Sequence, residues 1–181
     1  MNLDLSFWTK VSTRRKRIYS VIFIFLVGFI LVALGSLVPV SNSSAHTIVN
    51  QLNSTVHTNQ ASGTLPQYIF LNNFRICLIE FIPIVGPIFG VVSFVGTGYA
   101  LGAESKVLGY PPLLYVSFEV LNPIFWIEFT AYSITIAESI WLFRRLTQNR
   151  YWELKNTAIL IGICAALLAI GAIVESMLPL I

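Results

Sequence analysis

Residues 14–40, RRKRIYSVIFIFLVGFILVALGSLVPV, decide the fold of this chain. A cationic cluster at 14–17 precedes the apolar run Ile18–Val40, which contains no charged side chain. About 20 such residues are enough for a helix to cross the hydrocarbon core of a bilayer. Cationic segments beside membrane spans stay in the cytoplasm. The stretch therefore predicts a first transmembrane helix that starts on the cytoplasmic side and is too long for the core of a signal peptide.

The whole chain has the composition of a membrane protein. Of its 181 residues, 56% are hydrophobic and 10% are charged, and the mean hydropathy is +0.78. Soluble domains carry about 25% charged residues. The length allows a single membrane domain, residues 1–181, without a second soluble domain. The isoelectric point near 9.0 comes from cations that flank apolar runs, so we expect membrane lipids as partners and no nucleic acid.

Charge bias and hydropathy together predict five transmembrane helices. Nine of the 11 Lys and Arg residues lie in a basic arm, 1–17, and a basic loop, 144–155, both expected in the cytoplasm. The polar segment 41–66 has no charged side chain and is predicted to be an outer loop. After the first span, the others are expected at Tyr68–Ile82, Pro87–Ala103, Leu113–Phe143 and Asn156–Leu178. The prediction is an all-α, multi-pass helix bundle in the cell membrane, with the N-terminus inside and the C-terminus outside.

Two proline-containing sequences are predicted to break these apolar runs. The sequence Pro83-Ile84-Val85-Gly86-Pro87 divides the run at 67–102, because Pro removes a helical hydrogen bond and Gly lowers the cost of a turn. The dipeptide Asn122-Pro123 is expected to break or kink the run at 113–143. Short apolar stretches also allow a three-span alternative, in which 68–82 lies at the interface and 113–122 is re-entrant.

Polar side chains inside the apolar runs are the candidate functional residues. A charge at the centre of a lone membrane helix costs about 2.5–3.5 kcal/mol on insertion scales, so such groups pair, protonate or reach water. Arg75 is the only cation among them, and we predict that it pairs with Glu128, with Glu80 or Glu119 as substitutes. The hypotheses for Arg75 are a buried pair that fixes helix packing, a polar pathway or ligand site, and snorkelling of the side chain to an interface. The predicted network consists of Asn72, Asn73, Arg75, Glu119, Glu128, Glu138 and Glu175.

Glu128 and Glu138 are expected on one helical stripe with Ala131 and Thr135. The two carboxylates are about 15 Å apart along a helix axis, from a rise of 1.5 Å per residue. They cannot act together on one bond at that distance. Successive stations for a proton or cation, and separate helix–helix contacts, both remain open.

Small residues predict close helix packing in the run that follows Pro83. Gly86 and Gly90 are four residues apart, as are Gly98 and Gly102. Small residues at this spacing let membrane helices approach closely. The stripe is expected to consist of Gly86, Gly90, Ser93, Thr97, Ala100 and Glu104. It packs either within one chain or as the seam of a homo-oligomer.

Sequence motifs for catalysis, cofactors and metals are absent. His46 and His57 are the only histidines, and they have neither helical i,i+4 spacing nor an acidic neighbour, so no metal site is expected. Cys77 and Cys164 lie inside apolar runs and predict two buried free thiols. With no nucleophile–base motif either, we expect neither enzymatic activity nor a bound cofactor.

Two features concern the faces of the membrane. Phe7 and Trp8 are expected at the level of the headgroups, next to the basic cluster. Asn42 and Asn53 each begin an N-x-S/T sequon in the segment predicted to be outside, so both are candidates for glycosylation.

Four stretches between residues 68 and 179 resemble the stage II sporulation protein M family of membrane proteins. FLNNFR at 70–75 resembles the Asn-rich start of the conserved region, and GYALGA at 98–103 is similar to the Asn-Gly-x-x-Leu-Gly stretch. PIFWIEFTA at 123–131 resembles the Pro-His-Gly-x-x-Glu-x-x-Ala motif, and IVESMLP at 173–179 is similar to the C-terminal Glu near a Pro. The chain departs from the family at Thr97, Ile124 and Phe125, where the family has Asn, His and Gly.

The resemblance implies a membrane scaffold. Family members in spore formers are associated with a septal complex that degrades peptidoglycan, in which the membrane protein recruits hydrolases. The leading hypothesis is thus a non-enzymatic scaffold or organiser of a membrane or envelope complex, with protein partners still to be identified. The alternative is a small transporter or channel that uses Glu128, Glu138 and Arg75.

Overall fold

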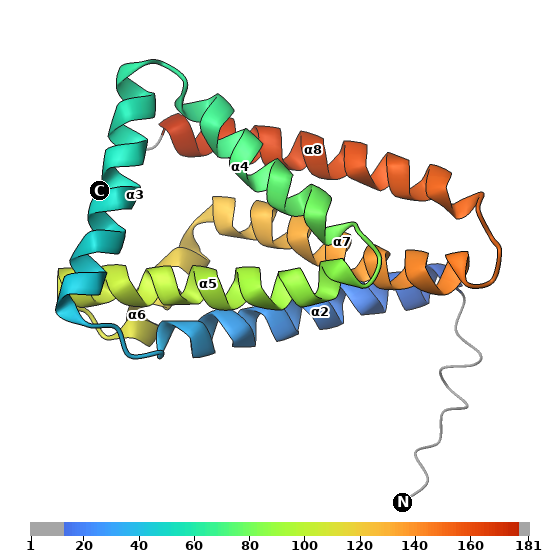
Figure 1. The fold of residues 1–181 in the computed structure, drawn as a ribbon, viewed down its shortest axis with the longest axis horizontal. Helices are drawn as coiled ribbons and strands as arrows, with labels where there is room; N and C mark the ends of the chain where they lie inside the picture. The colour runs from blue at the N-terminus through green and yellow to red at the C-terminus, as the bar shows by residue number, and fades with distance from the viewer. Residues whose placement is uncertain (1–12, 178–181) are drawn as a thin grey trace, which may run out of the picture.

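Every helix and turn described here comes from a computed structural model, which describes residues 13–177 and contains α-helices but no strands in that range (Figure 1). The helices are α2 (Thr13–Ser36), α3 (Asn42–Ala61), α4 (Leu65–Glu80), α5 (Val85–Leu108), α6 (Pro112–Leu121), α7 (Pro123–Leu146) and α8 (Glu153–Met177). In Figure 1, α2, α5, α7 and α8 run along the long axis of the molecule. The prediction of an all-α bundle is confirmed for this part of the chain.

Three of the described helices, α2, α5 and α8, are long and apolar enough to cross a membrane. A fourth span results if α6 and α7 are taken together, although they are bent by 91° where they meet. α4 has 16 residues, which at 1.5 Å per residue is about 24 Å, shorter than a hydrocarbon core of about 30 Å. The structure thus supports a multi-pass membrane protein with three to four candidate spans, and it leaves the predicted count of five unconfirmed.

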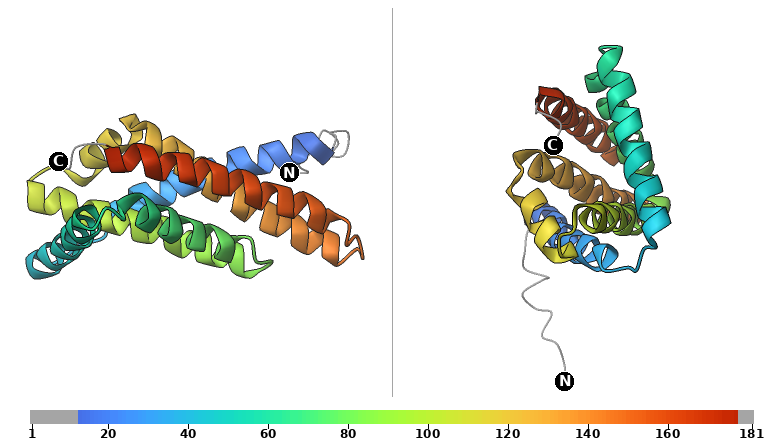
Figure 2. Two further views of the ribbon diagram at one scale, coloured as in Figure 1. Left: turned by 90° about the horizontal axis from the view of Figure 1, so that it is seen from above. Right: turned by 90° about the vertical axis from the view of Figure 1, so that its left-hand side faces the viewer.

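The polar segment predicted as an outer loop, 41–66, is helical over most of its length. α3 crosses one end of the bundle at a steep angle to the long helices (Figures 1 and 2). The Ser41 side chain caps it by accepting a hydrogen bond from the backbone N–H of Ser44 at 3.1 Å. The segment between the predicted spans is therefore helical over residues 42–61, and its place on the outer face stays a prediction.

An apolar stripe explains why this polar segment folds. Ala45, Ile48 and Leu52 recur at spacings of three and four residues, which places them on one face of a helix. Ala45 is fully buried in a cluster with Val40 and Ala103 of α5, and Ile48 packs against that cluster. The segment 42–61 also lacks Pro and Gly, so nothing in it breaks a helix.

The chain breaks at both predicted places. Between α4 and α5, the backbone N–H of Val85 donates to the carbonyl of Pro83 at 2.8 Å, which closes a γ-turn around Ile84. Ile84 has φ +70°, a strained value for a β-branched residue. Between α6 and α7, the Asn122 side chain caps α7 by accepting from the N–H of Ile124 at 3.0 Å. The run expected as one span at 113–143 is thus two helices.

The described part of the basic arm, 13–17, and the basic loop lie at the same end of the bundle (Figure 1). α2 begins there, and α7 and α8 are joined there by a short turn. The basic loop predicted at 144–155 is shorter than expected, because α7 continues to Leu146 and α8 already begins at Glu153. The predicted headgroup residues Phe7 and Trp8 lie outside the described residues, as does Leu178.

α2 and α5 cross closely because glycine lines their contact. A Cβ atom on Gly98 would lie 2.1 Å from the Val32 carbonyl oxygen, and one on Gly102 would lie 2.5 Å from that of Ser36. The buried face of α5 repeats every four residues, through Gly86, Gly90, Phe94, Gly98 and Gly102. All four glycines predicted to pack closely are buried, whereas Thr97 of the predicted stripe is exposed.

Candidate functional site

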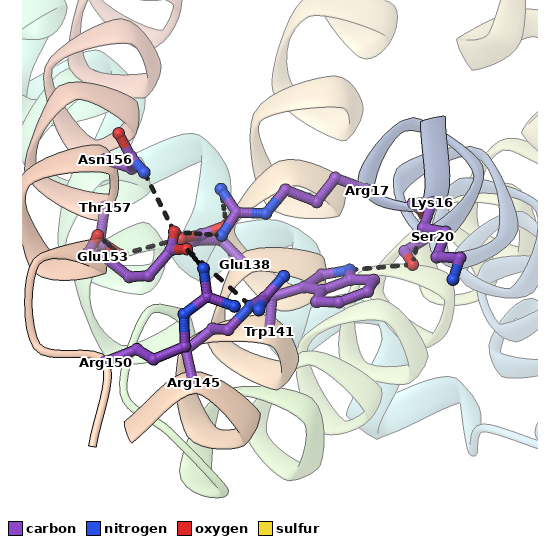
Figure 3. Close-up of polar contacts among 10 residues, drawn as sticks. All are labelled: Lys16, Arg17, Ser20, Glu138, Trp141, Arg145, Arg150, Glu153, Asn156 and Thr157. Atoms are coloured by element: carbon purple, nitrogen blue, oxygen red, sulfur yellow. Dashed lines mark hydrogen bonds and ion pairs between the residues drawn. The ribbon is translucent and has the colours of Figure 1, made fainter. Parts of the chain in front are cut away.

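The densest group of charged side chains joins α2, α7 and α8 at the basic end of the bundle (Figure 3). Arg17 of α2 donates a hydrogen bond to Glu153 Oε2 at 2.7 Å. Its other terminal nitrogen lies 3.8 Å from Glu138 Oε2 of α7. One guanidinium group thereby connects three helices. We call Arg17, Glu138, Arg145, Arg150 and Glu153 the basic-end cluster.

Glu153 is the centre of this cluster. Arg145 Nε and Arg150 Nη2 lie 3.9 and 3.7 Å from its Oε1 atom. Asn156 donates to its Oε2 atom at 3.0 Å. As the first residue of α8, Glu153 also places its negative charge at a helix N-terminus, where the helix dipole favours it.

Both carboxylates and Arg145 of the cluster are buried, while Arg17 and Arg150 are partly exposed, and this determines its energetics. Glu138 is 3% exposed, Glu153 6% and Arg145 8%. Thr157 satisfies Glu138 further by donating to its Oε1 atom at 2.9 Å. Charges removed from water are tolerated when they are paired and hydrogen-bonded, and losing one partner of such a group is strongly destabilising. The cluster therefore fixes how α2, α7 and α8 sit together.

Trp141 attaches α2 to the same region. Its Nε1–H donates to Ser20 Oγ at 3.1 Å. The guanidinium groups of Arg144 and Arg145 lie 5.6 and 5.7 Å from its ring centroid, within the range of cation–π attraction. Indole, guanidinium and carboxylate groups thus interlock at this end of the bundle (Figure 3).

The predicted polar network is divided among separate places. Asn73 of α4 donates a hydrogen bond to Glu128 Oε1 of α7. Asn72 and Glu175 line the same cavity of about 360 Å³ as this pair, under α3. Glu138 belongs to the basic-end cluster instead. Glu128 and Glu138, although on one helix, therefore bond to different elements.

Glu119 lies close enough to Glu128 and Glu175 for electrostatic repulsion among the three carboxylates, although it does not line the cavity under α3. It lies on α6, beyond the bend from α7. Nearby on the same helix, the Tyr115 hydroxyl donates to Glu104 Oε2 of α5 at 3.0 Å. That hydrogen bond fastens the C-terminal part of α5 to α6.

The predicted pair between Arg75 and Glu128 does not form. Arg75 is exposed, and among residues 13–177 no ion pair involves it. Asn73, Cys77 and Glu80 are spaced four and three residues apart and turn the inner face of α4 toward the bundle. Arg75 lies on the opposite face, so the pairing prediction is wrong for a simple geometric reason.

Glu80 is the acid whose burial the sequence does not predict. Its place near the inner end of the predicted span at 68–82 favours contact with water, yet the side chain is fully buried. Thr135 donates to its Oε2 atom at 2.7 Å, while its Oε1 atom has no hydrogen-bond partner among the described residues. Gly90 leaves space beside this Oε1 atom. A Cβ atom added to Gly90 would lie 3.8 Å from Glu80 Oε1 and 2.3 Å from the Ile136 side chain.

The remaining predicted residues have the following positions. Cys77 and Cys164 are free thiols, both fully buried in one apolar cluster, as predicted. Asn42 and Asn53 are exposed on α3, the first at its start and the second in its middle. His46 and His57 are exposed on the same helix, and no group of three or more potential metal ligands occurs within 13–177.

Sequence reasoning missed the role of Arg17, Arg145 and Glu153. The sequence indicates Arg17 and Arg145 only as charges that set membrane orientation, because each lies at the end of an apolar run, and it does not single out Glu153. A usable signal existed in Glu153, the only acidic residue of the basic loop at 144–155. One acid among several cations beside a membrane is a natural centre for an ion-pair cluster.

No protein-family model, curated protein or solved structure matches this chain. The resemblance to the stage II sporulation protein M family therefore remains a prediction from short motifs.

Proposed function

We propose that this chain is a non-enzymatic integral membrane protein that acts as a scaffold, or organiser, of a membrane or envelope complex. The observation that carries the proposal is the separation of its buried acids. Each of these acids has its own local partner: Thr135 donates to Glu80, whose Oε1 atom stays unpaired among the described residues. Asn73 donates to Glu128, and Thr157 and Arg17 contact Glu138. Each contact joins two helices locally, which is the arrangement of a packed framework and differs from a continuous polar path.

We further propose five crossings, with the N-terminus inside. The clustering of the basic segments at one end and of α3 at the other supports this orientation. In this arrangement α4 crosses with its polar ends at the interfaces, and α6 lies near the outer surface beside α7. α3 then rests on the outer face, where Asn42 and Asn53 are available for glycosylation.

α3 is the proposed surface for protein partners. Its residues 42–61 carry no Lys, Arg, Asp or Glu, and most of their side chains are exposed. Amides and hydroxyls on a rigid helix can form hydrogen bonds with a partner without desolvating charges. The resemblance to scaffold proteins of the stage II sporulation protein M family points in the same direction.

Photo-crosslinking tests this surface. A photoreactive residue would replace His57 on the exposed face of α3, and a matched control would replace the lipid-facing Ile30 of α2, which is 56% exposed. After irradiation in native membranes, mass spectrometry should find one defined protein adduct at position 57 and none at position 30. Identical adduct patterns at the two positions would contradict the proposal.

One observation favours a second candidate, a small transporter. The cavity under α3 is lined by Glu128 and Glu175, and by no Lys or Arg among the described residues. Purified protein in liposomes would be tested for proton and cation flux with pH- and potential-sensitive dyes. Flux above empty liposomes, lost in Glu128→Gln, would replace the scaffold by the transporter.

A further inference from the structure

A groove lies between α2 and α8 at the basic end of the bundle, with α7 as its floor. Its volume is about 540 Å³, within the range of sites for small organic ligands. α2 and α8 each pack along α7, and the hydrogen bond from Arg17 to Glu153 joins them at the rim of the groove. The groove does not belong to the cavity under α3, which lies at the other end.

The walls of the groove change from polar to apolar along α2. Arg14 and Arg17 line it at the start of the helix, and Ile18 and Val21 line it one turn further on. Arg17, Ile18 and Val21 come three, four and seven residues after Arg14, so all four side chains share one face of the helix. The change from cation to hydrocarbon takes place within about one helical turn, or roughly 5 Å.

The other two walls change at the same level. On α8, Asn156 is followed by Ile159 and Leu160, and on α7, Glu138 is preceded by Ile134 one turn deeper. α2 and α8 begin at the basic end and α7 ends there, and all three helices change from polar to apolar at one level. A boundary of this kind matches a single amphipathic molecule with a polar head and a hydrocarbon chain.

The rim has an excess of positive charge. In the basic-end cluster, three guanidinium groups face two carboxylates. Arg14 adds a further cation that forms no ion pair with any residue between 13 and 177. Arg17 Nε is buried and lacks a hydrogen-bond partner among the described residues. The rim therefore favours an anionic headgroup.

We propose that the groove binds one phospholipid with an anionic headgroup. Arg14 and Arg17 hold the phosphate, and one acyl chain lies against Ile18, Val21 and Leu160. Basic pockets between membrane helices are suited to such headgroups. The apolar residues deeper in the groove favour a lipid over free phosphate, because phosphate has no hydrocarbon chain to place there. The inference depends on the bundle's position in a membrane and is independent of the proposed scaffold role.

Native mass spectrometry of the full chain, released from mild detergent, tests the site. The probes are phosphatidylglycerol, phosphatidylcholine of the same chain length, and inorganic phosphate as a competitor. We expect one phosphatidylglycerol to stay bound at concentrations where phosphatidylcholine dissociates, and inorganic phosphate not to displace it. Equal retention of the two lipids, or displacement by phosphate, would overturn the proposal.

Two neighbouring arginines give a matched pair of variants. Arg14→Gln should weaken phosphatidylglycerol binding about fivefold, the expected effect of one basic residue near a charged lipid surface. Arg15→Gln removes the same charge from the same turn, but Arg15 does not line the groove, so its effect should be clearly smaller. Equal weakening by the two variants would show general attraction to the surface and refute a defined site.

A second pair of variants tests the acyl chain. Val21→Trp fills the apolar part of the groove and should abolish retention of the lipid. Ile22→Trp places the same side chain on the outer face of α2, where Ile22 is 50% exposed, and should leave retention unchanged. If the Val21→Trp variant folds and still retains phosphatidylglycerol, the proposed position of the acyl chain is wrong. If the variant fails to fold, the comparison of Arg14→Gln with Arg15→Gln tests the site instead.

Discussion

The two ends of the bundle hold their carboxylates in different ways. At the basic end, Glu138 and Glu153 are buried among guanidinium groups. At the other end, Glu128 accepts a hydrogen bond from the neutral amide of Asn73, beside a cavity whose lining includes no Lys or Arg among the described residues.

This difference indicates at which end of the bundle stability depends on charge. A buried ion cluster requires every member, because an unmatched charge is left without water. An amide–carboxyl contact needs only a donor and an acceptor, and a neutral acceptor serves as well. We therefore expect the basic end to be sensitive to changes of charge, and the end under α3 to be tolerant of them.

The largest effect is expected from Glu153→Gln. The change leaves Arg17, Arg145 and Arg150 with only one carboxylate nearby, so the free energy of unfolding should fall by about 3–5 kcal/mol. Unfolding in mixed detergent and SDS micelles, followed by the helical circular dichroism signal, measures it. Glu175→Gln is the control on the same helix, since Glu175 is exposed, and equal losses in the two variants would remove the distinction between the ends.

A double-mutant cycle sharpens the assignment at the basic end. Arg17→Gln and Glu153→Gln should together destabilise less than the sum of the single variants, with a coupling energy of about 1–3 kcal/mol, as for residues in direct contact. The same micelle unfolding experiment supplies the four free energies. Strict additivity would mean that the 2.7 Å contact between these side chains carries no stability.

A smaller effect is expected under α3. Glu128→Gln keeps an acceptor oxygen for Asn73, so the loss of stability should stay below about 1 kcal/mol. Glu128→Leu removes the acceptor and should cost more, about 1–3 kcal/mol, because the Asn73 amide is left unsatisfied. If Gln proved as harmful as Leu, charge would matter at this end too.

The smallest effect is expected from Arg75→Gln. Arg75 is exposed and unpaired within 13–177, and substitutions at such positions change stability by no more than about 0.5 kcal/mol. A drop in the unfolding midpoint similar to that of Glu153→Gln would restore the ion pair with Glu128 that the sequence suggested.

The sequence predicted the breaks of the chain better than its side-chain contacts. Pro83 and Asn122-Pro123 act on their own backbone, so their effect is local and can be read from the residues themselves. The pairing of Arg75 depends on which face of α4 meets α7, and a helix without a strong apolar asymmetry does not reveal that face. Arg75 therefore turned outward where composition suggested that it should turn inward.

α3 and the basic-end cluster escaped prediction for related reasons. The polar residues around Ala45 and Ile48 concealed a narrow apolar stripe, whose partner, Ala103, is far away in the sequence. Arg17 and Glu153 are 136 residues apart, and no local pattern links them. The small residues were predicted better, because the four-residue spacing of Gly86 and Gly90 favours close helix packing wherever the partner lies.

The close contact of α2 and α5 at Gly98 and Gly102 also has a consequence for the time course of synthesis. α2 ends at Ser36 and α5 ends at Leu108, so 72 residues separate the completion of the two helices. At 5–20 residues per second, the ribosome takes roughly 4–14 s to make them. Gly28 and Gly35 of α2 pack against Phe94 and Val95 of α5. Until α5 is made, this face of α2 is uncovered and another small-residue helix fits on it. Faster translation of residues 37–108 would shorten the interval and favour correct assembly of each chain.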